Sequence, residues 1–124
     1  MKDFTKQEGF DQHLSYQLVS YDETHCHITF DIQKHHLNIY GYVHGGVYYS
    51  LSDTTCGYIA TSIDDANWVT LNGSIQYIKA AKKGKLDIKA TCISKSRNTA
   101  NIDVVIYQGD ILCTKASFTM YRIG

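Results

Sequence analysis

The most constraining feature of this sequence is the spacing of its apolar residues, which changes from one period to another along the chain. In most of the chain they recur at every second position, as in Cys26, Ile28, Phe30 and Ile32. One segment, from Gly46 to about Ser62, has the period of a helix instead, and its main stripe is Val47, Leu51, Thr54, Thr55 and Tyr58. One long helix among half-buried strands predicts an α+β domain, because helix and sheet must bury each other.

The alternating segments predict five to six strands joined mostly by short polar turns. They cover residues 16–21, 24–32, 68–78, 86–92, 100–106 and 111–121, and the first thirteen residues allow a short irregular helix. Short connections impose antiparallel pairing, so we expect a curved antiparallel sheet around one central helix. Within 68–78 we expect one face to carry Val69, Leu71, Ile75 and Tyr77.

Composition excludes several classes of protein. We expect a single domain over residues 1–124, with no linker, because proline and low-complexity segments are absent. Twelve basic and twelve acidic residues cancel, which argues against a nucleic-acid partner. We find no signal peptide and no apolar run of membrane length, so we expect a cytoplasmic protein without a membrane partner. The four cysteines lack metal or disulfide spacing and are expected to be free thiols.

The segment that carries chemistry precedes and enters the predicted helix. Gly45 and Gly46 open the helix, where the first N–H groups have no internal partner and can bind an oxygen that becomes anionic. Asp53 lies two turns further on, among small residues of an apolar stretch. Taken singly, a Gly-Gly pair is more often a turn and a helical aspartate more often solvated. Together they leave a structural and a catalytic interpretation equally open.

The same segment resembles a known family. The pattern formed by Asn38, Gly41 and His44-Gly45-Gly46, followed by Leu51-x-Asp53-Thr54, is similar to the signature of PaaI-like thioesterases of the hotdog superfamily. The resemblance covers most of the chain, although the downstream matches, from Ile75 to Ile78 and at Gly84, are weak alone.

The resemblance implies a hotdog fold and hydrolysis of acyl-CoA thioesters by a homodimer or a dimer of dimers, without a bound cofactor. It implies that Asp53 is the base or nucleophile and that the Gly45 N–H is the oxyanion donor. Asn38 and His44 match positions that place the water or the thioester carbonyl. The residues expected to bind the substrate are Gly46, Thr54, Tyr77, Ser96 and Arg97.

One position departs from the family pattern. Some related enzymes carry a hydroxyl one turn after the carboxylate, where this chain has Gly57, and Thr54 or Ser50 are the candidates to replace it. The tyrosines at 40, 42, 48 and 49 favour packing at an interface over an acyl pocket for an aryl or long apolar group.

Two other functions use the same scaffold. A hotdog dehydratase of 3-hydroxyacyl thioesters is expected to place a histidine with its acid, and a non-catalytic acyl-CoA-binding protein would not need Asp53. Outside this segment, His25 and His27 share a strand face but lack a matching zinc pair, so we expect no metal site. Cys56 as a nucleophile would face a different side of the helix from Asp53.

Overall fold

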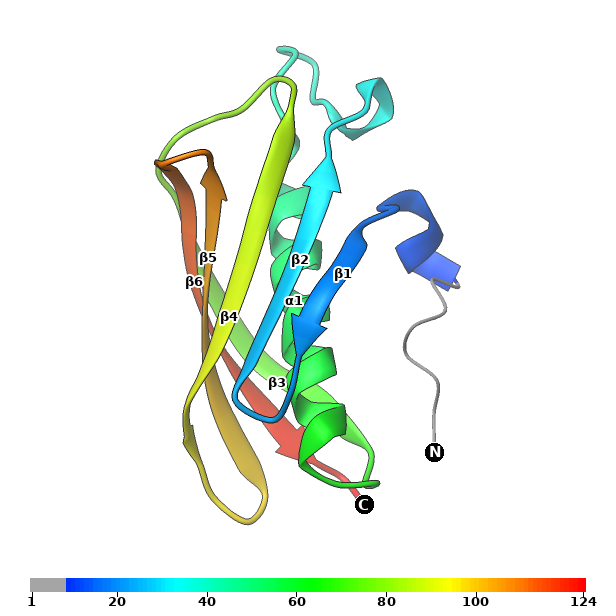
Figure 1. Cartoon of the computed structure of the whole chain (residues 1–124), viewed down its shortest axis with the longest axis vertical. Coiled ribbons are helices and arrows are strands. Elements are labelled where there is room, and N and C mark those ends of the chain that lie inside the picture. Colours follow the sequence, from blue (N-terminus) through cyan, green and yellow to red (C-terminus); the bar gives the residue numbers. More distant parts are fainter. Residues whose placement is uncertain (1–8) are drawn as a thin grey trace.

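The computed structural model describes residues 9–124, which form one α-helix, two short 3₁₀ helices and six strands (Figure 1). The order along the chain is η1 (Gly9–His13), β1 (Gln17–Tyr21), β2 (His25–Asp31), η2 (Lys34–His36), α1 (Gly45–Ile63), β3 (Trp68–Tyr77), β4 (Lys85–Lys95), β5 (Thr99–Gln108) and β6 (Ile111–Arg122). The predicted elements are confirmed to within a few residues. The irregular helix expected in residues 1–13 is present as η1, and residues 1–8 lie outside the described part.

The strands form a single antiparallel sheet in the order β1-β2-β4-β5-β6-β3. Helix α1 lies along one face of this curved sheet and contacts every strand (Figure 1). The predicted hotdog architecture is therefore confirmed. The two edges of the sheet are β1, the first strand of the chain, and β3, the strand that follows the helix.

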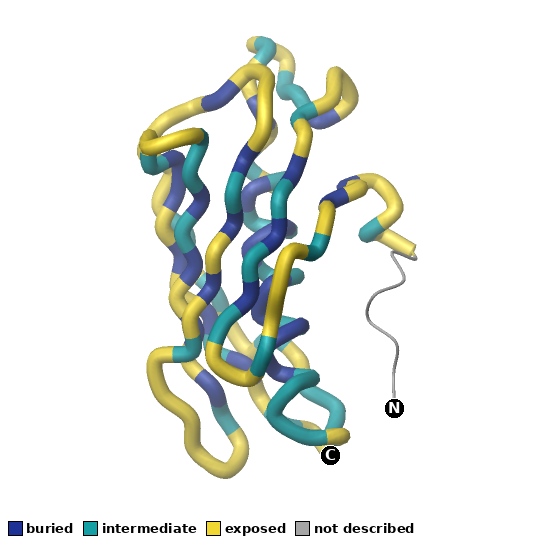
Figure 2. The backbone as a smooth tube through the Cα atoms, viewed as in Figure 1, coloured by how far each residue is buried: buried dark blue, intermediate teal, exposed yellow. Residues whose placement is uncertain are grey.

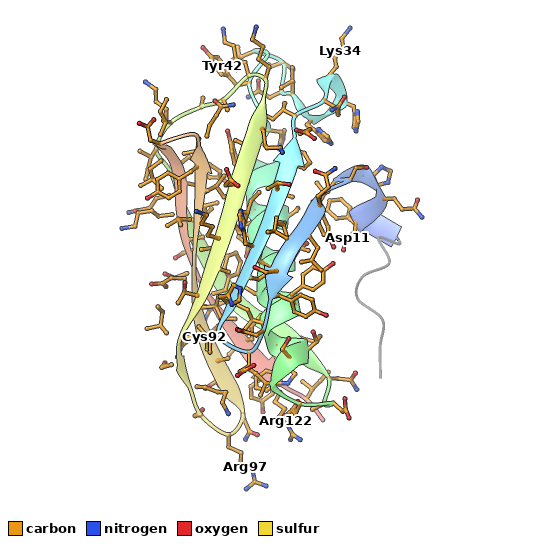
Figure 3. The ribbon with its side chains drawn as sticks, in the orientation of Figure 1. Asp11, Lys34, Tyr42, Cys92, Arg97 and Arg122 are labelled. Atoms are coloured by element: carbon orange, nitrogen blue, oxygen red, sulfur yellow. The ribbon has the colours of Figure 1, made fainter. Side chains whose placement is uncertain are left out.

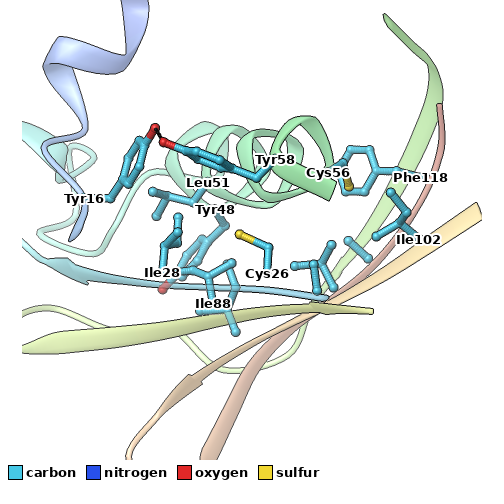
Figure 4. Close-up of a cluster of buried hydrophobic side chains, with 14 of the residues drawn as sticks. Tyr16, Cys26, Ile28, Tyr48, Leu51, Cys56, Tyr58, Ile88, Ile102 and Phe118 are labelled. Atoms are coloured by element: carbon cyan, nitrogen blue, oxygen red, sulfur yellow. Dashed lines mark hydrogen bonds between the residues drawn. The ribbon is translucent and has the colours of Figure 1, made fainter. Parts of the chain in front are cut away.

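The core lies between α1 and the inner face of the sheet, and buried positions alternate with more exposed ones along the central strands (Figure 2). In β2, Cys26, Ile28 and Phe30 are buried, as their alternation predicted. Leu51 from α1 packs with Ile28 and its neighbours from the strands (Figure 4). This layer of apolar side chains fixes the position of the helix over the sheet.

The prediction for β3 was wrong in one respect, because the strand carries a bulge. Its pairing with β6 shifts between Thr70 and Asn72, which leaves Leu71 as an extra residue. A bulge changes which alternate residues face inward on its two sides. Val69, before the bulge, and Leu71, at it, are therefore exposed (43% and 60%). Ile75, beyond the bulge, packs against the core. Before the bulge it is Thr70 that faces inward, opposite the buried Met120.

The start and the end of α1 are fixed by polar side chains. His44 is the N-cap, and its Nδ1 accepts a hydrogen bond from the Gly46 N–H at 2.9 Å. After the last helical residue, Asp64 accepts from the Trp68 indole N–H at 2.9 Å and pairs with Arg122 at 3.0 Å. These contacts tie the C-terminal end of the helix to β3 and β6. Within residues 9–124, no helix is long and apolar enough to cross a membrane.

Candidate active site

Asp53 lies in the middle of α1, on the stripe of small residues that the sheet does not cover. Its neighbours on this stripe, Ser50 and Gly57, are also only partly buried. One oxygen of the Asp53 carboxylate accepts a hydrogen bond from the Thr70 hydroxyl on β3, at 2.5 Å. The hydroxyl that contacts the Asp53 carboxylate thus comes from the neighbouring strand β3.

A cavity of about 230 Å³ opens beside Asp53 between α1, β3 and the N-terminal segment. Its lining residues are Asp11, Tyr16, Asp53, Thr54, Gly57, Tyr58, Trp68, Val69, Thr70 and Met120. Gly57 leaves part of this space open, since a Cβ added there would meet no atom within 4 Å. The cavity thus combines one carboxylate of the helix with aromatic and aliphatic walls.

The second carboxyl group of the cavity, Asp11, belongs to η1. The Tyr16 and Tyr58 hydroxyls lie 2.8 Å apart (Figure 4), and Tyr16 reaches Asp11 at 3.5 Å. Burial raises the pKa of the Asp11 carboxyl, as does the Asp53 charge, while hydrogen bonds from Tyr16 and Thr54 lower it. Asp11 and Asp53 are therefore close enough for their charges to interact.

The first turn of α1 contributes to a different cavity, of about 340 Å³. It is lined by Asn38, Tyr42, Val43, Gly45, Tyr48, Tyr77, Ile78, Lys79 and Ala80. Gly45 is the first helical residue, so its N–H has no acceptor within the helix. The Tyr77 hydroxyl donates to the Gly45 carbonyl oxygen at 2.9 Å, which fixes β3 against this end of the helix.

Asn38 shapes the loop that precedes the helix. Its side-chain oxygen accepts from the N–H groups of Tyr40 and Tyr42, at 2.9 and 3.1 Å. These two acceptor contacts fix the orientation of the amide. Its amide nitrogen is thus the group left to act as a donor toward a ligand in the cavity that Asn38 lines.

The predicted site residues therefore fall into three places. Asp53 and Thr54 line one cavity, whereas Gly45, Asn38 and Tyr77 line the other, with His44 and Gly46 at the helix start beside it. The two cavities share no lining residue. Ser96 and Arg97 form the β4–β5 turn at the opposite end of the molecule from Tyr42 (Figure 3), where Ser96 bonds Thr99 at 2.6 Å.

A protein-family model of the thioesterase superfamily matches residues 40–115. These residues include helix α1 and strand β3, which line both cavities.

The chain belongs to the thioesterase superfamily.

The structure of this superfamily member is similar to solved structures of two streptococcal proteins. It is 34% identical to a hypothetical thioesterase of Streptococcus pneumoniae solved with coenzyme A, over 89% of this chain and 87% of that one, with a TM-score of 0.83. A Streptococcus mutans protein bound to acetyl-CoA is 33% identical over 89% and 90%, with a TM-score of 0.84.

The fold is also that of the PaaI protein of Escherichia coli. That protein, from the phenylacetic acid degradation operon, is 23% identical over 91% of this chain and 83% of its own, with a TM-score of 0.85. The likeness extends the structural agreement over nearly the whole described chain.

The sequence did not indicate two of the residues that the structure places beside Asp53, Thr70 and Asp11. Thr70 follows Val69 in an alternating strand, and the alternation places it on the face opposite the apolar residues. Asp11 lies in a polar segment without periodicity, so nothing local marks it. The one available signal is the hydroxyl missing at position 57, which calls for a hydroxyl elsewhere near Asp53.

Cys56, His25 and His27, which the sequence offered as a nucleophile and as metal ligands, make other contacts in the structure. Cys56 is buried, and desolvation raises the pKa of its thiol well above the usual value, which disfavours the thiolate. His27 pairs with Asp87 at 2.8 Å, and His25 with Asp22 at 3.0 Å. In residues 9–124 no three metal-ligating side chains gather in one place.

Proposed function

We propose that the protein hydrolyses acyl-CoA thioesters to a free acid and CoA, with Asp53 as the catalytic carboxylate. The observation that carries the proposal is the position of Asp53, held by Thr70 at the mouth of a cavity lined with aromatic and aliphatic groups. Membership of the thioesterase superfamily supports it, and so do relatives solved with coenzyme A and with acetyl-CoA. The Streptococcus pneumoniae relative has also been solved with an aspartate and, separately, a threonine changed to alanine, which are the residue types of the Asp53–Thr70 pair.

In the proposed reaction the thioester carbonyl oxygen accepts a hydrogen bond from the Gly45 N–H, which stabilises the negative charge that develops on it. Asp53 either removes a proton from the attacking water or attacks the carbonyl carbon itself to form an anhydride that water then cleaves. In both routes the C–S bond breaks and CoA leaves as its thiol. Both routes use the same two groups, and Thr70 orients the carboxylate in each.

We further propose that each site is built by two copies of the chain. Gly45 and Asp53 are eight residues apart on one helix, which is about 12 Å along its axis. The separate cavities around them agree with this distance. A second helix running antiparallel beside the first would bring its Asp53 to the partner's Gly45 end. The uncovered stripe of Gly46, Ser50 and Gly57 would allow this approach, in a homodimer or a dimer of dimers.

The CoA part of the substrate is proposed to lie at the Gly45 end. Lys79 lines this cavity, and the Lys82 ammonium lies 4.8 Å from the centre of the Tyr42 ring beside it. These cations suit the phosphates of CoA. Ser96 and Arg97 remain predicted substrate contacts, and they would need to meet a substrate held by another copy of the chain.

The test is release of free thiol from a series of straight-chain and aryl acyl-CoAs. Wild-type protein should release thiol, and Asp53→Asn, which is nearly isosteric, should retain its fold and lose about 10²- to 10⁴-fold in turnover. Binding of acyl-CoA with no thiol release would identify a non-catalytic binding protein instead. Loss of water from a 3-hydroxyacyl-CoA, without free thiol, would identify a dehydratase.

A further inference from the structure

The cavity beside Asp53 has an uneven distribution of charge. Two carboxyl groups line it, Asp53 from α1 and Asp11 from η1, and none of its described lining residues is Lys, Arg or His. Asp53 is required by the proposed reaction, whereas Asp11 has no part in it. The remaining lining residues are neutral, and most of them are aromatic, aliphatic or hydroxyl-bearing.

The location of the cavity assigns it to the acyl part of the substrate. The thioester carbonyl carbon must come within about 3 Å of the Asp53 carboxylate or its water. On one side of that carbon is the sulfur, which leads to CoA and the Lys79 end of the proposed site. The acyl chain leaves on the other side, and the space open to it next to Asp53 is this cavity, with Trp68, Tyr58 and Asp11 on its walls.

Asp11 is held in place and is not a freely moving surface carboxylate. Asp11 is half-buried in η1, and its carboxylate accepts a hydrogen bond from the Tyr16 hydroxyl. The Tyr16 hydroxyl oxygen in turn lies 2.8 Å from the Tyr58 hydroxyl oxygen on α1. The first residue after η1, Leu14, is buried, and its N–H donates to the Asp11 carbonyl oxygen at 3.0 Å. The segment thereby anchors the Asp11 carboxylate against the acyl cavity.

We propose that Asp11 is a specificity-determining residue that makes the acyl cavity reject acyl groups ending in a carboxylate. This inference rests on the proposed thioesterase function. A dicarboxylic monothioester would bring its free carboxylate into a cavity that already holds two carboxyl groups and, among residues 9–124, no lining Lys, Arg or His. A monocarboxylic acyl group of the same length ends in a methyl group, which the aromatic and aliphatic walls accommodate.

The proposal is tested with pairs of substrates that differ only in the terminal group, pentanoyl-CoA against glutaryl-CoA and hexanoyl-CoA against adipoyl-CoA. The measured quantity is the ratio of kcat/KM for the dicarboxylic to the monocarboxylic member. We expect a low ratio in the wild type, and an increase of about tenfold in Asp11→Asn, as removal of one nearby like charge at a partly exposed site predicts. A second neutral variant, Asp11→Ser, should give the same increase.

Two controls separate charge from structure. Asp11→Glu keeps the charge and should keep a low ratio, and Asp110→Asn removes an equal charge from the exposed β5–β6 turn and should leave the ratio unchanged. A local loosening of η1 would lower both rates together without moving their ratio. Folding of each variant is checked by its thermal unfolding curve.

The outcomes distinguish this inference from the function on which it rests. If the wild type releases no thiol from any substrate, the proposed function fails. If it hydrolyses hexanoyl-CoA and adipoyl-CoA equally well, or if neither neutral variant raises the ratio, the role of Asp11 is overturned while the thioesterase function stands. Equal rates on hexanoyl-CoA and adipoyl-CoA would overturn the role of Asp11 with wild-type protein alone, so this test does not depend on whether the variants fold.

Discussion

At the scale of single residues, the Asp53 carboxylate depends on a neighbour from another element. The Thr70 hydroxyl donates to one of its oxygens, so the carboxylate has one preferred orientation in the cavity. The other oxygen is the one left to meet water or the thioester carbon. Because this contact spans helix and strand, it also couples the position of β3 to the proposed catalytic group.

Replacing Thr70 by valine, which has the same shape, should therefore lower turnover by about tenfold or more, but less than Asp53→Asn. The physical reason is that a freely rotating carboxylate spends less time in the productive geometry. Thiol release from the preferred acyl-CoA is the measurement, and Thr70→Ser, which keeps the hydroxyl, is the matched control. Equal activity of Thr70→Val and wild type would show that Asp53 needs no such support.

The candidate site was predictable from the sequence only where its residues are local. Gly45 and Asp53 follow from a helix start and from an acid in an apolar helix, both of which are readable within a few positions. Thr70 faces Asp53 because of pairing with β6, and Asp11 approaches because η1 folds back over the helix. Such contacts depend on tertiary structure, so no local pattern indicates them.

At the scale of elements, the bulge in β3 is the feature that periodicity alone missed. The register of β3 is set by β6, and the extra residue at Leu71 is accommodated only in that pairing. The strand then presents Thr70 to the helix before the bulge and Gly73 after it. The pairings β1–β2, β4–β5 and β5–β6 also carry register shifts, but in β2 and β5 the predicted apolar residues still alternate on one buried face, as Ile102, Val104 and Ile106 do.

At Gly73, β3 packs closely on its neighbours. A Cβ there would lie 2.5 Å from the Phe118 ring and 2.7 Å from the Tyr49 hydroxyl oxygen. Gly73→Ala should therefore lower the free energy of unfolding by about 1–3 kcal/mol, measured by urea denaturation. In the background of Phe118→Leu the same change should cost less, and additive costs would show that the ring is not the obstacle.

The segment η1, which carries Asp11, is joined to η2 by the buried His36. Its Nε2 bonds the His13 carbonyl oxygen at 2.8 Å, and its Nδ1 accepts from the Gln33 N–H at 2.9 Å. Burial lowers the pKa of His36 below its ordinary 6.5, with a further lowering by His35 and an opposing effect of the His13 carbonyl. Protonation would also remove the acceptor that Gln33 uses.

The sign of the pH effect follows from the lowered pKa. As the pH falls below about 6.5, the unfolded chain binds a proton at this position before the folded chain does. The stabilisation by neutral His36 is thus complete above pH 6.5 and is lost as the pH falls through the folded pKa. Urea denaturation at pH 7.5 and 5.5 should show a smaller loss in His36→Asn, which keeps an acceptor for Gln33 but does not titrate. Equal losses in both proteins would assign the effect to other groups.

At the scale of the whole molecule, the exposed features lie where a second copy is expected. The edge strand β3 has an unpaired side and exposes Val69 and Leu71, and α1 leaves its small-residue stripe uncovered. Natural proteins rarely leave a long apolar edge open. With zero net charge, net electrostatic repulsion between two copies is small.

The last prediction is that two inactive variants restore each other. Asp53→Asn lacks the proposed catalytic carboxylate, and Gly45→Pro lacks the proposed oxyanion donor. Proline is well tolerated at the first position of a helix, and the extended backbone of His44 (φ −61°, ψ 136°) is compatible with a following proline. Each variant alone should be inactive. A mixed dimer should regain one site of two, formed by Gly45 of one chain and Asp53 of the other.

The control for this experiment comes from the packing around Gly45. A Cβ added there would lie 3.1 Å from the Tyr77 ring, so any side chain presses on Tyr77. Gly45→Ala introduces the same Cβ but keeps the N–H, and it should remain active if the N–H is the group that matters. The mixed dimer is purified with two different affinity tags, and its thiol release is compared with that of a tagged wild-type dimer, where about half is expected. A folded, purified mixed dimer without activity would place Gly45 and Asp53 in the same chain's site, or remove one of them from the mechanism.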